Sequence, residues 1–310
     1  MDGQLYIDAP LTSFSQQYRN DPAGFIQDVV APVVLVEKKT GKYAYYPKSN
    51  LKAPVNSLRT GEGKTARANF QVQWKSYSEL NEHALKDGIT KDQYDMYQDP
   101  LDPEQDTTTY LMDQLQLERE IELAAYISNT SNVTQFAGPS TQWNATTGAG
   151  SPFLDIEAGI NQMQINGLRP PNMIVMGYYV WSQLKNHPDL LDRVKYSQLG
   201  TLTTELMASL FGDSGITKVV VARAAYDTTS EGVTASNTYI VGKNLWLIHS
   251  EPNPSLRSVN FMHTLVLKNG RYVDSWPVID RKTTYFRVND FYSQFLVGPE
   301  AIYMIQGAVA

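Results

Sequence analysis

The stretch from Glu104 to Asn129, EQDTTTYLMDQLQLEREIELAAYISN, belongs to the longest segment of the chain that lacks both proline and glycine. It is rich in residues that favour helices, so it predicts one long helix. The residues before it fit a helix start: Asp102 can cap, Pro103 suits the first helical position, and Gln105 has the spacing of a capping box. The chain is organised around this helix.

The apolar residues of the predicted helix do not form one stripe. At about 100° per residue they fall on two nearly opposite sides, Leu111, Met112 and Leu115 on one and Leu117, Ile121, Ala124 and Ala125 on the other. A helix on the surface of a domain keeps a single apolar face. Two interpretations stay open here: a core helix of an ordinary domain, or a spine that packs on different neighbours along its length.

Composition limits the class of protein. The 310 residues can form one large or two ordinary domains, and 42% of them are hydrophobic, as in globular proteins. The formal charge of -6 argues against a dedicated DNA-binding protein, which needs a basic stripe. Cysteine is absent, which excludes disulfides and cysteine metal sites. Without a signal-like N-terminus or a long apolar run, the sequence predicts a soluble, intracellular protein.

The segment before the long helix predicts an arm and a projecting hairpin. Residues 1–20 are polar and aperiodic, a short helix is expected from Asp21 to Val30, and a strand follows over 31–36. Two extended segments, Lys42 to Pro47 and Asn69 to Tyr77, then flank a polar, basic stretch, 48–68. The simplest interpretation is a long two-stranded projection. The alternative is a mobile surface loop, and because an isolated hairpin is marginally stable, a projecting one should lie on something else.

The remaining segments predict a mixed α/β protein. A short helix followed by a polar connection is expected over Glu79 to Asp99, and a polar loop over 129–151. The second half alternates helices and apolar strands, with helices expected over 154–166, 178–186 and 202–211, and strands over 172–176, 218–222, 238–241, 245–249, 264–267, 282–295 and 301–305. This pattern is typical of a compact α/β unit followed by closing strands.

Two short motifs resemble catalytic or nucleotide-binding signatures. Gly61-Glu62-Gly63-Lys64-Thr65 is similar to the end of a phosphate-binding loop, but Leu58 stands where that motif needs glycine. Gly212-Asp213-Ser214-Gly215 is similar to the nucleophile turn of trypsin-like proteases, with Ser214 as the nucleophile. It joins a predicted helix to a predicted strand, a position that Gly and Asp fill in ordinary turns.

No group of residues forms a catalytic, cofactor or metal signature. The histidines, His83, His187, His249 and His263, are scattered singly, without the spacing of metal ligands. The charged run Glu118, Arg119, Glu120 and Glu122 fits either a solvated helix face or salt bridges to a neighbouring subunit. We therefore predict no catalytic residue, no cofactor and no metal, and a structural or binding role rather than an enzyme.

The order of the parts resembles a known family: polar arm, basic hairpin, long helix, α/β unit and closing strands. This order is similar to the major capsid protein of tailed bacteriophages, which has the Hong Kong 97-like fold. The resemblance covers essentially the whole chain and is carried by five stretches: Phe25 to Pro32 leading into a valine-rich strand, Gly41-Lys42-Tyr43, Tyr77 to Leu85, Met173 to Gly177 with Leu184 to Pro188, and Leu210 to Gly212 leading into Lys218 to Val221.

The resemblance implies an α+β fold with a defined division of the chain. The parts would be an N-terminal arm (1–41), an extended β-hairpin loop over a neighbouring subunit (42–78), a peripheral domain (79–134) with the spine helix 104–129, an axial domain (135–274), and return strands of the peripheral domain with the C-terminus (275–310). The short segment before the hairpin leaves no room for a fused scaffolding domain, so a separate scaffolding protein is expected.

The family's function is then the expected function here. Copies of the chain would form the hexamers and pentamers of an icosahedral virion capsid, assembled in the cytoplasm of a host bacterium. The shell would enclose double-stranded DNA without sequence-specific binding, and would work with a portal and decoration proteins but no membrane. The expected inter-subunit contacts place the loop, Arg59, Lys64, Arg67, Phe70 and Trp74, against an acidic surface of the next subunit, Glu118, Glu120 and Glu122.

Two alternatives remain. An encapsulin-like compartment around a protein cargo has the same fold, and an intracellular serine hydrolase using Ser214 belongs to a different class of protein. On the spine interpretation, Leu115 and Ile121 should both be buried, on opposite sides of the long helix.

Overall fold

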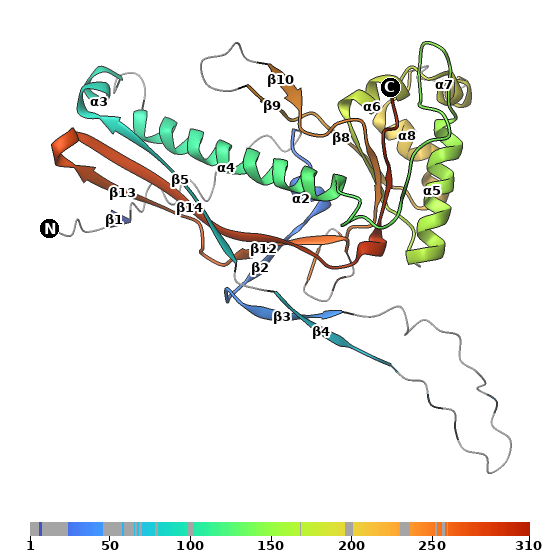
Figure 1. The fold of residues 1–310 in the computed structure, drawn as a ribbon, viewed down its shortest axis with the longest axis horizontal. Helices are drawn as coiled ribbons and strands as arrows, with labels where there is room; N and C mark the ends of the chain where they lie inside the picture. Colours follow the sequence, from blue (N-terminus) through green and yellow to red (C-terminus); the bar gives the residue numbers. More distant parts are fainter. Residues whose placement is uncertain are drawn as a thin grey trace.

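The computed structural model describes residues 6–7, 24–45, 58, 65, 67, 70–77, 80–97, 102–167, 169–195, 201–229, 236–251, 253–255, 258 and 260–310. Figure 1 shows an elongated molecule in which a long helix lies along a long sheet. At one end of this pair is a compact α/β unit, and a two-stranded ribbon projects from the body.

The long sheet is built around one fourteen-residue strand, β14 (Thr283–Leu296). One edge of β14 pairs antiparallel with β5, and the other pairs first with β13 and then with β12. Two further strands extend the sheet, β2 parallel to β12 and β1 antiparallel to β13. The bounds are β1 Tyr6–Ile7, β2 Val33–Val36, β5 Asn81–Thr90, β12 Met262–Leu267 and β13 Tyr272–Val278.

The helix predicted to begin near Glu79 is wrong. The chain instead forms the strand β5, followed by the helix α3 (Lys91–Tyr97). Pairing with β14 runs along the whole strand, from Thr90 opposite Thr283 to Asn81 opposite Tyr292. Local helix propensity is weaker than such an extended pairing, which no single segment of sequence encodes.

The long helix α4 (Pro103–Ser128) confirms the predicted spine to within a residue at each end. Its cap is the predicted one, because the Asp102 carboxylate accepts hydrogen bonds from the backbone N–H groups of Glu104 and Gln105. The first half of α4 buries Leu111, Met112 and Leu115 against the long sheet. The second half buries Leu123, Ala124 and Ile127 against a different cluster, which includes the sheet of the α/β unit.

The two buried faces of α4 differ in detail from the prediction. At about 100° per residue they are offset by roughly 120°, so they are not opposite. Leu115 is buried as expected, whereas Leu117 and Ile121 are only half-buried and Ala125 is exposed. The helix therefore packs on two sheets along its length, but through Leu123 and Ile127 rather than Ile121.

The α/β unit is organised around a five-stranded sheet, in the order β6-β15-β11-β7-β8. On β11, Leu245 and Leu247 face one buried cluster while Trp246 and Ile248 face another, so the strand is buried on both sides. Helices α5 to α8 contribute to the first cluster, whereas α2 (Gln27–Val30) and the end of α4 contribute to the second. The bounds are α5 Pro152–Gly167, α6 Tyr178–Leu184, α7 Pro188–Val194, α8 Thr204–Leu210, β6 Phe136–Ala137, β7 Met173–Gly177, β8 Lys218–Ala222, β11 Leu245–Ile248 and β15 Ile302–Ile305.

Sheet membership departs from the predicted division at two places. Strand β12 and the start of β13 fall within the stretch expected to be axial, 135–274, but both strands belong to the long sheet. Strand β15 falls among the expected return strands, but it pairs with β11 in the five-stranded sheet. A buried apolar strand has the same local pattern in either sheet, so its partner is not readable from the segment alone.

The projecting ribbon consists of β3 (Gly41–Tyr45) and β4 (Gln73–Tyr77). They pair antiparallel from Gly41 opposite Tyr77 to Tyr45 opposite Gln73, as predicted for the two arms of the hairpin. A smaller hairpin, β9 (Ala225–Asp227) with β10 (Asn237–Tyr239), lies at the edge of the α/β unit. The predicted arm over 1–20 and loop over 48–68 lie almost entirely outside the described residues.

Candidate interaction surface

The ribbon is fixed firmly at its base. Tyr43 and Tyr77 are buried in a cluster with side chains of β2 and β12. The Tyr43 hydroxyl donates a hydrogen bond to the Leu296 carbonyl (3.3 Å), and the Tyr77 hydroxyl donates one to the Lys38 carbonyl (3.3 Å). A Cβ at Gly41 would lie 2.2 Å from the Tyr77 hydroxyl, so the close packing requires glycine. The base therefore sets the direction in which the ribbon projects.

The outer part of the ribbon carries large apolar side chains in solvent. Phe70 and Trp74 are 69% and 65% exposed, and Val72 between them is also exposed. Aromatic side chains are enriched where one protein contacts another. Phe70 and Trp74 are therefore exposed, and their contact with a neighbouring subunit stays a prediction.

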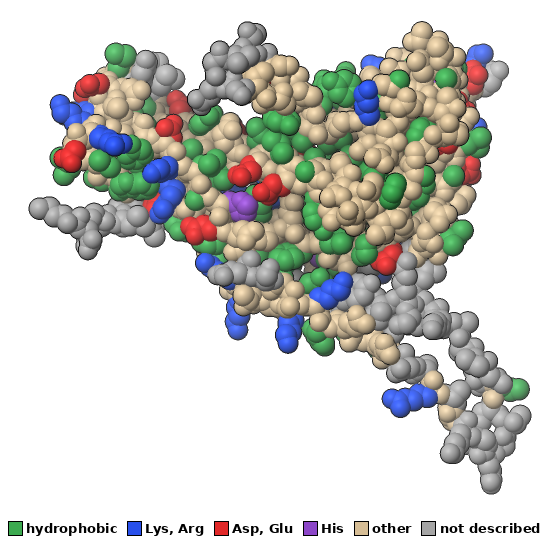
Figure 2. All heavy atoms as spheres, viewed as in Figure 1, with side chains coloured by type: hydrophobic (Ala, Val, Ile, Leu, Met, Phe, Trp, Pro, Cys, Tyr) green, Lys and Arg blue, Asp and Glu red, His purple; other side chains and the backbone are tan. Residues whose placement is uncertain are grey.

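Of the basic residues assigned to the same contact, the structure describes one. Arg67 is exposed. Arg59 and Lys64 lie outside the described residues, as does most of the stretch similar to a phosphate-binding loop. Basic side chains gather on the ribbon side of the molecule in Figure 2.

The acidic side of the predicted contact needs one correction, at Glu120. This residue is fully buried, and its two carboxylate oxygens accept hydrogen bonds from the backbone N–H groups of Ile26 (3.0 Å) and Gln27 (2.9 Å). Burial raises the pKa of Glu120 to about 7, although both hydrogen bonds and the nearby Arg119 act in the opposite direction. Glu120 holds α2 against the spine helix and is not available to a neighbouring subunit.

Arg119 joins three elements at the same junction. Its Nη2 donates to Asp28 Oδ1 in α2 (2.9 Å) and to Thr264 Oγ1 in β12 (3.2 Å). The Thr264 hydroxyl in turn donates to the Ala31 carbonyl (2.9 Å). The charged run of the sequence is therefore divided between two faces of the helix. Arg119 and Glu120 point into the molecule, whereas Glu118 and Glu122 are exposed.

Glu118 and Glu122 are exposed, and they lie beside His83 of β5. One ligand atom from each of the three residues lies within 4.8 Å of the other two. The sequence did not predict this group, because His83 is far from the glutamates along the chain and only the packing of β5 against α4 brings them together. Among the described residues, these three side chains form the one group of His, Asp and Glu whose ligand atoms lie close enough together to hold a metal ion.

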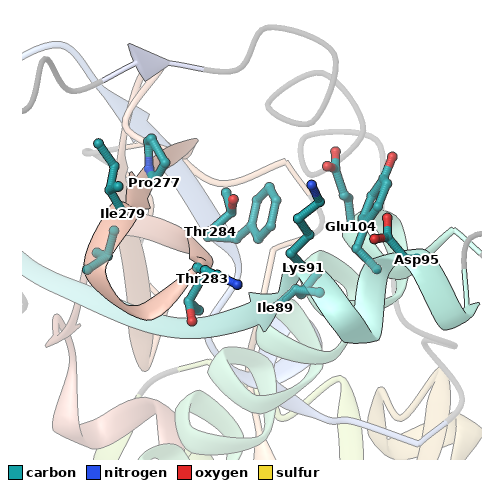
Figure 3. A pocket seen from close by; sticks show the side chains of 12 residues that line it. Ile89, Lys91, Asp95, Glu104, Pro277, Ile279, Thr283 and Thr284 are labelled. Carbon is teal, nitrogen blue, oxygen red and sulfur yellow. The ribbon is translucent and has the colours of Figure 1, made fainter.

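A cavity of about 540 Å³ opens at the far end of the long sheet, between α3, the start of α4 and the β13–β14 hairpin. Figure 3 shows Lys91, Asp95 and Glu104 on one side of it and Pro277 and Ile279 on the other. Its charged groups come from exposed or half-buried residues.

Ser214 has no catalytic surroundings in the part of the chain that the structure describes. It lies in a single 3₁₀ turn, η2 (Gly212–Ser214), between α8 and β8, and Gly215 ends the turn with φ +96°. No hydrogen bond from its hydroxyl to a histidine occurs among the described residues. The motif is an ordinary turn between a helix and a strand, as its position in the sequence predicted.

In the described part of the chain, none of the helices combines the length and the apolar character that crossing a bilayer requires.

No protein-family model matches the sequence. One relative is 28% identical over 312 residues, which cover 97% of this chain and 96% of the relative. It is the major capsid protein of Burkholderia phage BcepMu.

Solved structures match the fold over nearly its whole length. A phage-related protein from Bordetella bronchiseptica superposes with a TM-score of 0.74 at 19% identity, covering 98% of each chain. The capsid structure of cyanophage P-SCSP1u gives 0.61 at 11% identity, covering 94% of this chain and 91% of that one. An encapsulin from Synechococcus elongatus gives 0.53 at 10% identity, covering 96% and 95%. At these identities the structures show a common fold, which is that of capsid shells.

Proposed function

We infer that this chain is a major capsid protein of a tailed phage with the Hong Kong 97-like fold, and from that premise we propose that its copies self-assemble into an icosahedral shell around double-stranded DNA. The observation that carries the inference is the relative from phage BcepMu, which aligns over almost the full length of both chains. The mixed α and β architecture agrees with it, since phage capsid structures share the fold.

The projecting ribbon supports self-assembly by a physical argument. A subunit that recurs in five- and six-fold rings needs a contact between two different surfaces, and this contact must close on itself. A ribbon with a rigid base and exposed aromatic residues offers one such surface, because it adds contact area beyond the body of the subunit. We propose that Phe70 and Trp74 anchor it on the neighbouring subunit.

The basic residues of the loop have a secondary role in this proposal. Exposed ion pairs contribute only about 0–1 kcal/mol each, whereas a buried aromatic anchor contributes more. Arg59, Lys64 and Arg67 would orient the loop over the neighbour, where Glu118 and Glu122 remain as exposed acidic candidates. Reversing Arg67 to Glu should then impair assembly but leave the fold intact, while Arg67→Lys, which keeps the charge, should assemble. If Arg67→Glu formed normal shells, Arg67 would not be part of the contact between subunits.

We propose the same peripheral and axial parts as the resemblance implies, but with each strand assigned to the part whose sheet it joins. The long sheet and α4 form the peripheral part and the five-stranded sheet forms the axial part, near the symmetry centres. The role is structural, without catalysis. A separate scaffolding protein, a portal, decoration proteins and assembly in the bacterial cytoplasm complete the proposal.

An encapsulin-like compartment is the alternative, because that fold is shared. The sequence relative favours the phage capsid. The purified protein should form closed particles in negative-stain micrographs, and particles isolated from the source should contain nuclease-protected double-stranded DNA. Closed particles that carry protein cargo instead of DNA would favour the compartment, and a small discrete oligomer would exclude both.

A further inference from the structure

The group formed by His83, Glu118 and Glu122 has the geometry of a chelating site. Glu118 and Glu122 are one helical turn apart on α4, so their side chains lie side by side, and His83 approaches them from β5. One ligand atom from each lies within 4.8 Å of the others. Figure 2 shows a histidine beside acidic side chains on this face of the molecule.

The two carboxylates lack a counter-charge within the described residues. Like charges four residues apart destabilise a helix, and neither Glu118 nor Glu122 forms a salt bridge there. The nearest cation along the helix, Arg119, is bound to Asp28 and Thr264, and its guanidinium lies 5.6 Å from the centroid of the Tyr292 ring. The close approach of these two carboxylates would be eased by a bound cation.

A second observation comes from the sheet beneath the group. Tyr292 is 2% exposed, and its hydroxyl has no hydrogen-bond partner among the described residues. Its ring stacks on His83, with centroids 4.0 Å apart and planes at 11°. An unsatisfied buried hydroxyl at this place calls for a polar partner.

We propose that His83, Glu118 and Glu122 bind one divalent transition-metal cation, with Zn²⁺ as the best-suited ion. One imidazole nitrogen and two carboxylate oxygens are a ligand set for Zn²⁺, whereas Mg²⁺ and Ca²⁺ prefer oxygen alone. Three protein ligands leave a fourth position for water, which can bond the Tyr292 hydroxyl. Ligand distances of about 2.0–2.2 Å require the donor atoms to lie within about 4 Å of one another, a small closure for exposed glutamates.

The binding site joins α4 to β5, so the ion would clamp the spine helix to the edge of the long sheet. The stacked ring of Tyr292 orients His83 for this role, which makes Tyr292 a positioning residue. Nothing in the proposal depends on the shell, because all three ligands come from one chain.

The test is calorimetric titration of the purified, chelator-treated full chain with Zn²⁺. We expect one ion per chain, a lower affinity by about 10- to 100-fold or more in His83→Ala and in Glu122→Gln, and unchanged affinity in Glu157→Gln, a matched change of an exposed helical glutamate. Tyr292→Phe should weaken binding by a smaller factor. Co²⁺ should give visible absorption bands that Zn²⁺ removes, a readout that requires no variant.

Binding that is equal in the wild type and His83→Ala, or the absence of both saturable Zn²⁺ binding and Co²⁺ bands, would overturn the proposal.

Discussion

Glu120 is the residue on which the attachment of the N-terminal segment to the spine depends. Its carboxylate holds the backbone of α2 from inside the molecule, and burial makes its charged form costly. Without Glu120, the backbone N–H groups of Ile26 and Gln27 would be buried donors without this hydrogen-bond acceptor. One side chain therefore links the start of the described body to the helix that spans it.

The raised pKa of Glu120 predicts a specific pH dependence. The folded pKa of about 7 exceeds the reference value of 4.5, so the folded chain retains a proton that the unfolded chain has lost within this window. As the pH rises from about 5 to about 8, this group should lower the free energy of unfolding by up to about 3 kcal/mol. Chemical denaturation of the wild type and of Glu120→Gln across this range measures the difference. Parallel profiles for the two proteins would refute the assignment.

The burial of Glu120 could be predicted from the sequence only if the second apolar face of α4 was assigned to the correct residues. Glu120 lies three residues before Leu123, and therefore on the face of α4 that meets the five-stranded sheet. The sequence pattern instead placed that face on Ile121, which left Glu120 among the solvated charges. His83 was missed for another reason, since its partners come from a different element.

The spine helix α4 couples two sheets, and each half should contribute to stability through a different side chain. Leu123 is fully buried, so Leu123→Ala should lower the free energy of unfolding by about 2–5 kcal/mol. Leu154→Ala on α5 is the matched control, because Leu154 is 57% exposed and its loss should change stability by less than about 0.5 kcal/mol. Equilibrium denaturation followed by circular dichroism measures both. Equal effects for the two variants would show that α4 does not pack as described.

The ribbon should contribute to assembly and not to folding. Trp74→Ala removes an exposed aromatic anchor, and truncating such a residue at an interface typically costs about 2 kcal/mol or more. We expect the critical concentration for shell formation to rise by at least about tenfold, while the circular dichroism spectrum stays the same. Light scattering against concentration measures this, with Gln73→Ala on the same strand as the control. An unchanged critical concentration for Trp74→Ala would place Trp74 outside the contact.

At the level of elements, the sequence predicted those with a strong local pattern. The capped helix α4, the alternating strand before Tyr77 and the apolar strands β7, β8 and β11 were expected at nearly their observed bounds. Strand β5 was not, because its stability comes from pairing with β14, almost two hundred residues later in the chain. The same dependence on distant partners explains why the sheets to which β12 and β15 belong could not be predicted from their own segments.

At the scale of the whole molecule, the order of the parts was more informative than any motif. A projecting ribbon, a spine and an α/β unit fit a subunit in which other copies of the chain complete part of the surface. The exposed aromatic residues of the ribbon and the rigid packing at its base fit that requirement. A self-sufficient globular protein has little use for such a projection.

The most direct test of this account is a cryo-electron microscopy reconstruction of particles formed by the purified chain. The account predicts closed icosahedral shells of five- and six-fold rings, in which the ribbon β3–β4 of one subunit lies over its neighbour and Trp74 is buried at that contact. A discrete small oligomer, or a closed shell in which Trp74 stays exposed to solvent, would contradict it.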